Sequence, residues 1–195
     1  MTNIILKSLG VKNFGPFADE VRFTTVTDRS KKEFLENTFS NGDDTFNRIS
    51  YIFGANGSGK SNFCKAIIQI QNLINLSPLL ASNSPQLLEL QPVKLSTSEM
   101  DKHFLFDVSG KDIPTEYTIE IVMDGIAYNY SFSVHHGLIM SEKLTKKKKR
   151  TETILLRTSP EYSSIELKSE LASFETNISV VKDRALCLSM AAFLN

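Results

Sequence analysis

Residues 54–61 read Gly-Ala-Asn-Gly-Ser-Gly-Lys-Ser, which is a glycine, four residues and then Gly-Lys-Ser. Glycines let the backbone curl so that consecutive N–H groups point inward at a phosphate. Lys60 adds a mobile cation for the outer phosphates, and the Ser61 hydroxyl is a ligand that Mg²⁺ accepts. The stretch therefore predicts a nucleoside triphosphate site that uses ATP and Mg²⁺. The residues expected to hold the nucleotide here are Gly54, Ala55, Asn56, Gly57, Ser58, Gly59, Lys60, Ser61 and Asn62.

The segments around the loop have the patterns that such a loop needs. Ile49–Phe53 is apolar and predicts a short buried strand that runs straight into the loop. Apolar residues then recur at helical spacing over 60–76 and predict a helix of about four turns, ended by Ser77-Pro78. A glycine-rich turn alone would not explain the Lys-Ser pair, so the context favours nucleotide binding.

The rest of the chain predicts an α/β fold. Residues 3–11 and 20–26 predict a hairpin, 27–47 a polar connection with one short ordered piece, and 77–100 a loop. Short strands then recur up to about residue 167 and predict an antiparallel β meander, with Asp124-Gly125 and His136-Gly137 as turns. The predicted strands of the meander are His103–Val108, Tyr117–Met123, Ile126–Val134, Leu138–Leu144, Thr153–Arg157 and Ser163–Leu167.

Three parts follow from these patterns. Residues 1–102 hold the first strands, the loop and its helix, within a mixed sheet. Residues 103–167 form the antiparallel β subdomain, and residues 168–195 begin a helical region.

Composition sets limits on the class of protein. The chain has 195 residues, 22 of them basic and 22 acidic, so its net charge gives no support for nucleic-acid or membrane binding. No apolar stretch approaches the length of a membrane helix, and the N-terminus lacks signal-peptide features, so we expect a soluble cytoplasmic protein. Cys64 and Cys187 have no disulfide or metal-ligand spacing and are expected to be buried free thiols.

The loop and its flanks resemble one group of ATPases. Asn56-Gly57-Ser58-Gly59 is similar to the loop interior of the ABC-type ATPases that include SMC proteins, RecF and the OLD-like nucleases. Lys12–Phe17 looks like that group's Asn-Phe signature after a first strand, and Ser61–Ile67 resembles its Ser-Asn-Leu-x-Lys-Ala-Leu. Further segments resemble the OLD-like AAA/ABC branch of phage-defence and abortive-infection systems: Glu36–Phe39, Pro92–Leu95, 124–132, 139–144 and 186–195.

This resemblance implies a P-loop NTPase head lobe of ABC type. In that group two heads pair as a homodimer around the nucleotide, and ATP controls an effector nuclease or toxin. Asn13 and Phe14 are then expected near the base and ribose. Two alternatives stay open for Phe14 and Phe17: they stack near the adenine, or they pack under the sheet.

Residues for hydrolysis are missing from the pattern. Such ATPases need a strand that ends in Asp-Glu, to hold Mg²⁺ and to position the attacking water. The nearest candidate, Thr118–Asp124, is followed by Gly125 and predicts a hairpin turn instead. No Leu-Ser-Gly-Gly signature is present, and Phe193 stands where the family has a glutamine. We therefore predict no catalytic residue within these 195 residues, which we expect to be the N-terminal lobe of a longer ATPase.

Weaker features leave rival hypotheses. The basic run Lys146–Arg150 suits a nucleic-acid backbone, but a solvated turn between two strands is favoured. His135-His136 has no further ligand nearby and predicts a turn rather than a metal site. A lobe of a RecF- or SMC-like DNA-repair ATPase is the alternative function, and a non-catalytic module stabilised by nucleotide is the third.

Overall fold

Strands and one long helix dominate the chain. The computed structural model describes residues 3–28, 35–81, 103, 105–106 and 108–194. The strands are β1 (Ile4–Lys12), β2 (Val21–Thr24), β3 (Thr38–Asn41), β4 (Asp44–Asn47), β5 (Thr115–Met123), β6 (Ile126–His135), β7 (Leu138–Lys147), β8 (Thr151–Arg157) and β9 (Ile165–Leu167). The helices are α1 (Lys60–Ala81) and α4 (Cys187–Leu194), with the 3₁₀ segments η1 (Leu35–Asn37), η2 (Val108–Asp112), η3 (Tyr162–Ser164) and η4 (Ser169–Val180).

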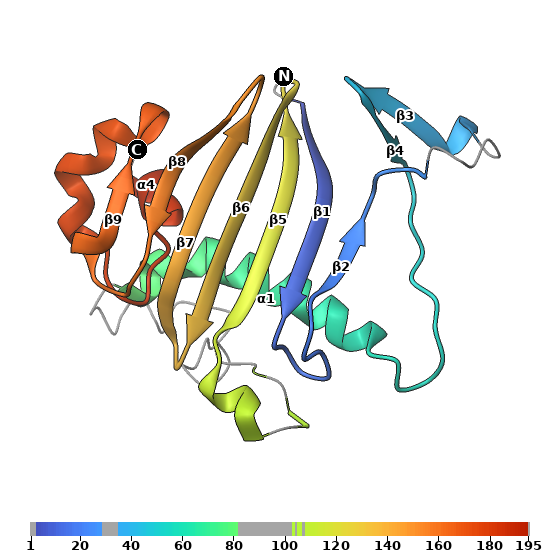
Figure 1. The fold of residues 1–195 in the computed structure, drawn as a ribbon, viewed down its shortest axis with the longest axis horizontal. Helices are drawn as coiled ribbons and strands as arrows, with labels where there is room; N and C mark the ends of the chain where they lie inside the picture. The colour runs from blue at the N-terminus through green and yellow to red at the C-terminus, as the bar shows by residue number, and fades with distance from the viewer. Residues whose placement is uncertain (1–2, 29–34, 82–102, 104, 107, 195) are drawn as a thin grey trace.

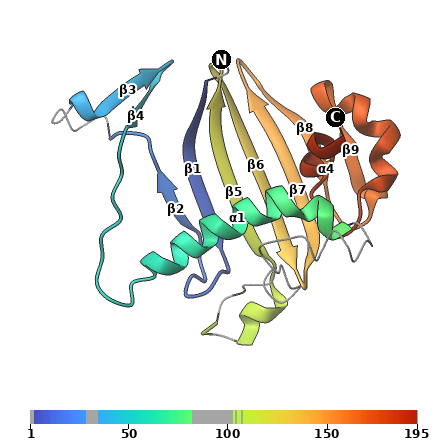
Figure 2. The same cartoon turned by 180° about the vertical axis from the view of Figure 1, so that it is seen from behind.

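One large sheet organises these elements. Its seven strands follow the order β2-β1-β5-β6-β7-β8-β9, and every neighbouring pair is antiparallel. Helix α1 crosses one face of the sheet from the β2 end toward α4 (Figures 1 and 2). The predicted α/β class with an antiparallel meander is confirmed. A parallel strand pair, which a mixed sheet requires, is not formed within the described ranges.

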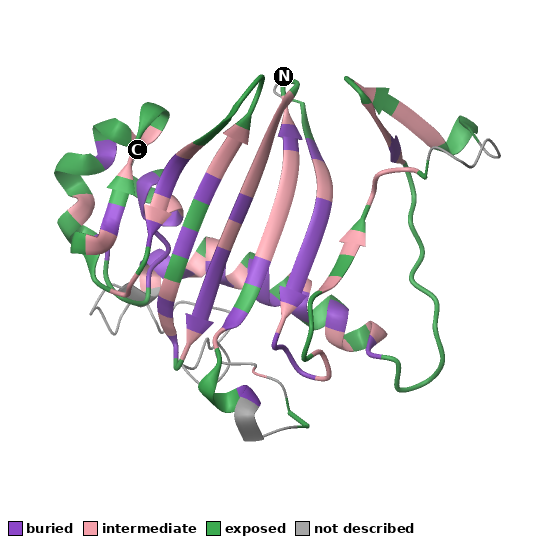
Figure 3. Cartoon of the chain, viewed as in Figure 1, coloured by how far each residue is buried: buried purple, intermediate pink, exposed green. Residues whose placement is uncertain are grey.

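The core lies between the sheet and α1. Alternate residues of the strands are buried, as the bands along β5 to β8 show (Figure 3). Leu9 and Val11 of β1 and Tyr117 of β5 are buried in the same apolar cluster as Phe63 and Leu73 of α1. The other sheet face carries mainly polar side chains next to β2, which is usual for an antiparallel sheet that is covered on one side.

The turns of the meander follow the sequence signals. Asp124 and Gly125 both have positive φ, at 50° and 78°, and His136 and Gly137 repeat this at 50° and 74°. Two successive left-handed residues give the tight turn whose twist matches antiparallel strands. The predicted hairpins at both places, and the hairpin of residues 3–11 with 20–26, are confirmed.

A further hairpin lies in residues 27–47, the region predicted as a polar connection with one short ordered piece. β3 and β4 pair around a turn at Gly42, whose φ is +60°, and the rings of Phe39 and Phe46 stack at 5.5 Å. Phe46 is buried against Ile5 and Val122 of the large sheet. The sequence signal for this hairpin is Gly42, which lies between two short segments that carry Phe39 and Phe46.

Three further predictions are wrong. Ile49–Phe53 is not a strand: Tyr51 and Phe53 are 74% and 87% exposed, and no described strand lies beside them to complete their hydrogen bonds. His103–Val108 forms no strand in its described residues. Helix α1 does not end at Ser77-Pro78 but continues to Ala81. The buried Ser77 Oγ accepts a hydrogen bond from the Leu186 N–H at 3.1 Å, which ties this turn of α1 to the segment before α4.

The two cysteines differ from each other. Cys187 is buried, and burial raises the pKa of its thiol to about 12. Cys64 is exposed on α1, so the prediction of two buried thiols is wrong for Cys64. None of the described helices combines the length and apolarity that crossing a membrane would take.

A buried carboxylate fixes α4 to the sheet. Glu142 of β7 is fully buried and accepts hydrogen bonds from the Tyr130 hydroxyl at 2.7 Å, the Cys187 N–H at 2.7 Å and the Leu188 N–H at 2.9 Å. The two N–H groups belong to the first turn of α4, where helix N–H groups lack partners within the helix. Arg157, opposite Glu142 in β8, donates to the Ala185 carbonyl at 2.8 Å. Burial raises the pKa of Glu142 and lowers that of Arg157.

We predict that Glu142→Ala lowers the free energy of unfolding by about 3–5 kcal/mol, because it leaves the Tyr130 hydroxyl and two helix N–H groups without their acceptor and removes the negative charge near the buried Arg157. Urea denaturation measures the change. Glu166→Ala, at an exposed position of β9, is the matched control and should change stability by about 0.5 kcal/mol or less. A Glu142→Ala loss no larger than that of the control would contradict the role of this carboxylate.

The raised pKa of Glu142 also predicts a pH dependence. A raised folded-state pKa contributes stability that is present below the unfolded-state pKa and is lost as the pH rises through the folded-state pKa. The stability of the wild type relative to Glu142→Gln, which cannot ionise, should therefore fall as the pH rises above the usual pKa of a glutamate carboxyl. A difference that stays constant or grows with pH would show that the carboxylate is not disfavoured by burial.

Candidate functional site

The glycine loop curls between an extended segment and the start of α1. Gly57 has φ +82° and Gly59 has φ +92°, backbone conformations that side-chain-bearing residues rarely adopt. The Ser58 N–H donates to the Ala55 carbonyl at 3.2 Å and closes the turn, and the Phe63 N–H donates to the Gly59 carbonyl at 2.9 Å as the helix begins. The loop thus leads directly into a helix N-terminus, where unpaired N–H groups and the helix dipole favour an anion.

Lys60 folds back over this loop. Its Nζ donates to the carbonyls of Gly54 and Ala55, at 2.8 Å in each case. The ammonium group therefore stands beside the loop's own backbone, within reach of any anion that the loop N–H groups bind. Ser61 and Asn56 are exposed, and Asn62 is half-buried. Predicted residues 54–62 are thus contiguous around one curl of backbone.

The contact between Gly59 and Phe17 fixes the helix end of the loop. A Cβ on Gly59 would lie 2.6 Å and 2.8 Å from two ring carbons of Phe17 and 3.5 Å from Pro16. Gly15, two residues earlier in the same turn, stands next to Asn62, since a Cβ there would be 3.8 Å from its side chain. The turn after β1 is therefore packed directly against the start of α1.

Asn13 and Phe14 anchor this turn to the fold. Asn13 is buried with φ +53°, and its Nδ2 donates to the carbonyls of Gly110 and Ile113 at 2.9 and 2.7 Å. Phe14 is buried edge-on against Tyr117, with ring centroids 6.3 Å apart. Of the two phenylalanines, Phe14 packs in the core and Phe17 reaches the loop. Contact of Asn13 and Phe14 with a nucleotide stays a prediction, and their buried side chains count against it.

A pocket of about 290 Å³ lies between the edge of β2 and the loop. Its walls are mainly apolar, and Gly54, Ser58 and Lys60 form its polar end. The sequence analysis does not assign Val21 and Phe23 of β2 to the site, and the structure brings them beside the loop. The lining residues are Phe17, Val21, Arg22, Phe23, Ile52, Phe53, Gly54, Ser58, Gly59, Lys60 and Phe63.

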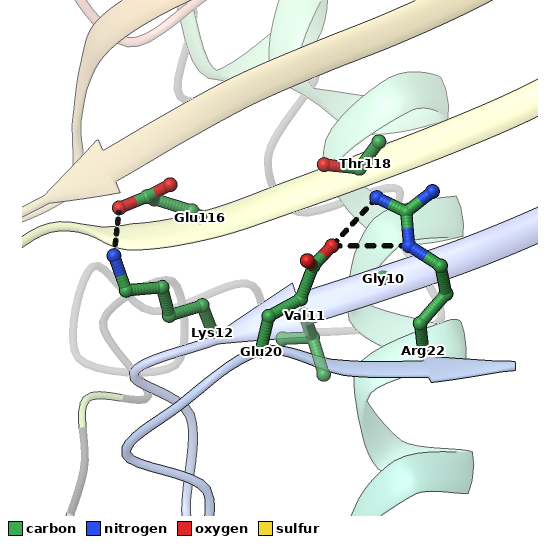
Figure 4. A pocket seen from close by; sticks show the side chains of 7 residues that line it. All are labelled: Gly10, Val11, Lys12, Glu20, Arg22, Glu116 and Thr118. Carbon is green, nitrogen blue, oxygen red and sulfur yellow. Dashed lines mark hydrogen bonds and ion pairs between the residues drawn. The ribbon is translucent and has the colours of Figure 1, made fainter.

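A second groove, of about 430 Å³, lies on the polar face of the sheet above Gly10 (Figure 4). Its charges are matched. Lys12 pairs with Glu116 at 3.1 Å, and Arg22 pairs with Glu20 at 2.7 Å. Because each cation in the groove has a carboxylate partner, the groove has no excess positive charge for a phosphate, in contrast with the loop at Lys60.

The basic run lies far from the loop. It spans the last residues of β7 and the turn to β8, at the end of the sheet opposite the start of α1 (Figure 1). Lys146 pairs with Glu170 at 2.6 Å and with Glu152 at 3.4 Å, while residues 147–150 are exposed. The hydrogen bond that Lys146 donates to the Glu170 carboxylate is the main cause of a raised pKa of Lys146. The run therefore takes no part in the loop site.

His135 is the last residue of β6 and His136 begins the turn that follows, so the prediction of a turn is confirmed for His136. The rings of His135 and His136 lie 4.0 Å apart, and the His135 Nε2 contacts the Lys111 carbonyl at 3.0 Å. Within the described ranges of the chain, no cluster of three or more His, Cys, Asp or Glu side chains suits a metal ion.

Comparison with known families gives one match. Residues 49–170 match the family described as "AAA domain, putative AbiEii toxin, Type IV TA system". The match covers more than half of the chain and includes the whole glycine loop and α1. No curated protein matches the chain at the level taken as significant.

We predict that Gly59→Ala destabilises the fold by about 2–3 kcal/mol, because the new methyl group meets Phe17 in addition to the backbone strain. Gly57→Ala is the matched control: its φ is also positive, but no atom lies within 4 Å of the added Cβ. Chemical denaturation of both variants, and of Gly59→Ala combined with Phe17→Ala, measures the contact. Equal losses for Gly59→Ala and Gly57→Ala would contradict it.

Proposed function

This chain belongs to the AAA-domain family of AbiEii-like proteins, and we propose that it is an ATP-binding lobe whose loop at residues 54–61 holds the triphosphate with Mg²⁺. The observation that carries the proposal is the loop itself: two left-handed glycines, a lysine folded over the curl and an open helix N-terminus meet at one place. Family membership makes a nucleotide the expected anion.

Each loop residue has a distinct part in the proposal. The N–H groups of the curl donate to the phosphate oxygens, and Lys60 leaves the Gly54 and Ala55 carbonyls to contact the outer phosphates. Ser61 is exposed at the first turn of α1, so its hydroxyl is free to serve as a ligand to Mg²⁺. When bound, the metal would neutralise part of the phosphate charge.

We further propose that this chain binds ATP without hydrolysing it at an appreciable rate. The acidic residue nearest to the required pattern, Asp124, stands in the β5–β6 turn at φ +50°, and its Oδ1 accepts a hydrogen bond from the Asn3 N–H at 3.1 Å. It is therefore a hairpin residue. The acids that hold Mg²⁺ and activate water would come from outside these 195 residues.

The wider role that we propose is control of an effector. The loop interior and its flanks resemble OLD-like ATPases of bacterial anti-phage defence, and the family description refers to a toxin. In this proposal two heads pair around ATP, and the pairing controls a nuclease or toxin partner. A DNA-repair lobe of RecF or SMC type is the second candidate, favoured by the exposed basic turn at residues 147–150.

The test is thermal melting of the purified chain with ATP, ADP or no ligand, with and without Mg²⁺. At a hundredfold excess of ATP over its Kd, we expect Tm to rise by roughly 5–10 °C, with a smaller rise when Mg²⁺ is chelated. Lys60→Ala should weaken ATP binding about tenfold or more, because a charged hydrogen bond to phosphate is lost.

Lys65→Ala is the matched control, since Lys65 is exposed one turn further along α1 and should leave the shift unchanged. Phosphate release by the wild-type chain should stay at background. The proposal is wrong if ATP leaves the wild-type Tm unchanged, or if Lys60→Ala keeps the full shift. Rapid turnover that Lys60→Ala abolishes would overturn the proposed lack of hydrolysis.

A further inference from the structure

The face of the sheet that α1 leaves uncovered is the near face in Figures 1 and 3, and its charges are distributed unevenly. Next to β2, each cation in the groove above Gly10 is paired with a carboxylate. Farther along the sheet, Lys143 and Lys147 of β7 are exposed, and neither forms an ion pair with a carboxylate of the described residues. The matching of charges therefore stops before β7.

Neighbouring positions show that Lys143 and Lys147 lie on this outer face. Glu142 and Leu144, on either side of Lys143, are buried on the α1 side, so Lys143 points the other way. Lys147 lines an outer-face groove of about 260 Å³ together with Thr145. β7 thus presents two unpaired ammonium groups on one side of the sheet.

The turn after β7 enlarges this group of cations. Lys148, Lys149 and Arg150 are exposed there, directly after Lys147. These three residues, with Lys143 and Lys147, form a surface that we call the basic face. It runs from the middle of β7 to the tip of the β7–β8 hairpin.

The nearby acids do not cancel the charge of the basic face. Glu142 is buried on the opposite side of β7, and Glu152 pairs with Lys146 at 3.4 Å. Glu166 of β9 lies two strands away from β7, and Asp124, in the turn before β6, adds one negative charge at the tip end. A local surplus of positive charge therefore remains, although the net charge of the whole chain is zero.

Neutral hydrogen-bond donors lie among these cations. Ser131 of β6 is opposite Lys143, Thr145 lies between the two lysines of β7, and Thr153 of β8 is opposite Thr145. Lysine, serine and threonine side chains are the donors that commonly bind the phosphate oxygens of a nucleic acid. The composition of this surface therefore suits a phosphodiester backbone.

The scarcity of apolar side chains narrows the class of partner. Within residues 114–161, all of which are described, no large apolar side chain is exposed. Protein interfaces have an apolar core, membrane-surface segments insert apolar side chains, and single-stranded nucleic acids stack their bases on aromatic rings. A duplex needs none of these, because it can be held through its phosphates alone.

The spacing of the two lysines also fits a duplex. Lys143 and Lys147 are four residues apart on one strand, which corresponds to about 13 Å at roughly 3.3 Å per residue. The major groove of B-DNA is about 12 Å wide. The two ammonium groups can therefore contact phosphates on both sides of a groove, while the hairpin tip follows one backbone.

We propose that the outer face of β6–β8, with the basic face at its centre, binds the phosphate backbone of double-stranded nucleic acid without reading its sequence. The proposal does not rest on ATP binding. It gives the second candidate function a defined surface, and it would apply equally to a defence ATPase that contacts a duplex.

Fluorescence anisotropy with a labelled DNA duplex, and with an RNA duplex of the same sequence, tests the proposal. For four or five phosphate contacts, the logarithm of the binding constant should fall with the logarithm of salt concentration at a slope of about −4. Lys143→Ala with Lys147→Ala should weaken binding about tenfold or more at low salt and make the slope shallower by about two. Its Tm should stay close to that of the wild type, because both side chains are exposed.

The matched control is Lys65→Ala with Lys182→Ala, which removes the same charge from two exposed positions outside the basic face. This control and Lys60→Ala should both bind the duplex as the wild type does, so a failure of the nucleotide site is distinguishable. Binding to either duplex supports the proposal, and the tighter of the two identifies the nucleic acid. Equal losses for the two double variants would overturn it, as would no binding to either duplex.

Rival ligands are tested in the same assay. A single strand that binds as tightly as the duplex would overturn the preference for a duplex. Binding to phosphatidylserine vesicles that the Lys143→Ala and Lys147→Ala variant loses, in a chain that binds no duplex, would assign the face to a membrane instead and overturn the proposal.

A second variant adds charge instead of removing it. Ser131→Glu places a carboxylate opposite Lys143 on the sheet face, whereas Ser173→Glu places one at an exposed position of η4. We expect duplex binding about tenfold weaker for Ser131→Glu and nearly unchanged for Ser173→Glu. Equal binding by the two variants would show that the sheet face takes no part in binding.

Discussion

Contact between the ring of Phe17 and the bare Cα of Gly59 ties the loop to the sheet. Phe17 belongs to a turn that cannot move freely, because Asn13 is hydrogen-bonded to the 110–113 segment and Phe14 is buried beside Tyr117. The helix end of the loop is therefore set by packing against the end of β1. Glycine at position 59 serves two purposes: it permits φ +92° and it leaves room for the ring.

Helix α1 connects the loop to the far side of the molecule. α1 begins at the loop, packs along the buried face of the sheet and reaches the far side at Ser77, whose hydroxyl accepts the Leu186 N–H. One residue further, the first turn of α4 is held by Glu142 from β7. These contacts form one connected set, which joins the turn after β1, the loop, α1, α4 and β7. Residues 49–53, which are exposed, take no part in these contacts.

Local signals in the sequence were sufficient for much of this. The loop, its helix and the two glycine hairpins depend on φ values and spacings that neighbouring residues encode, and these predictions agree with the structure. The strand prediction for Ile49–Phe53 is wrong because a strand needs a neighbouring strand for its hydrogen bonds. The apolar residues of the segment do not show whether such a neighbour is present. Pro78 does not end α1, and the contact of Ser77 with the distant Leu186 N–H is one that local spacing does not reveal. The role of Glu142 depends on pairing across the sheet, which spacing along the chain does not reveal.

The central claim is that backbone N–H groups of the loop bind a triphosphate, and amide hydrogen exchange with and without ATP and Mg²⁺ tests it most directly. We expect slower exchange at residues 55–62 when ATP is present, and no such slowing in Lys60→Ala. Unchanged exchange across the loop, in a chain saturated with ATP by an independent binding assay, would contradict the account and move the nucleotide to another site.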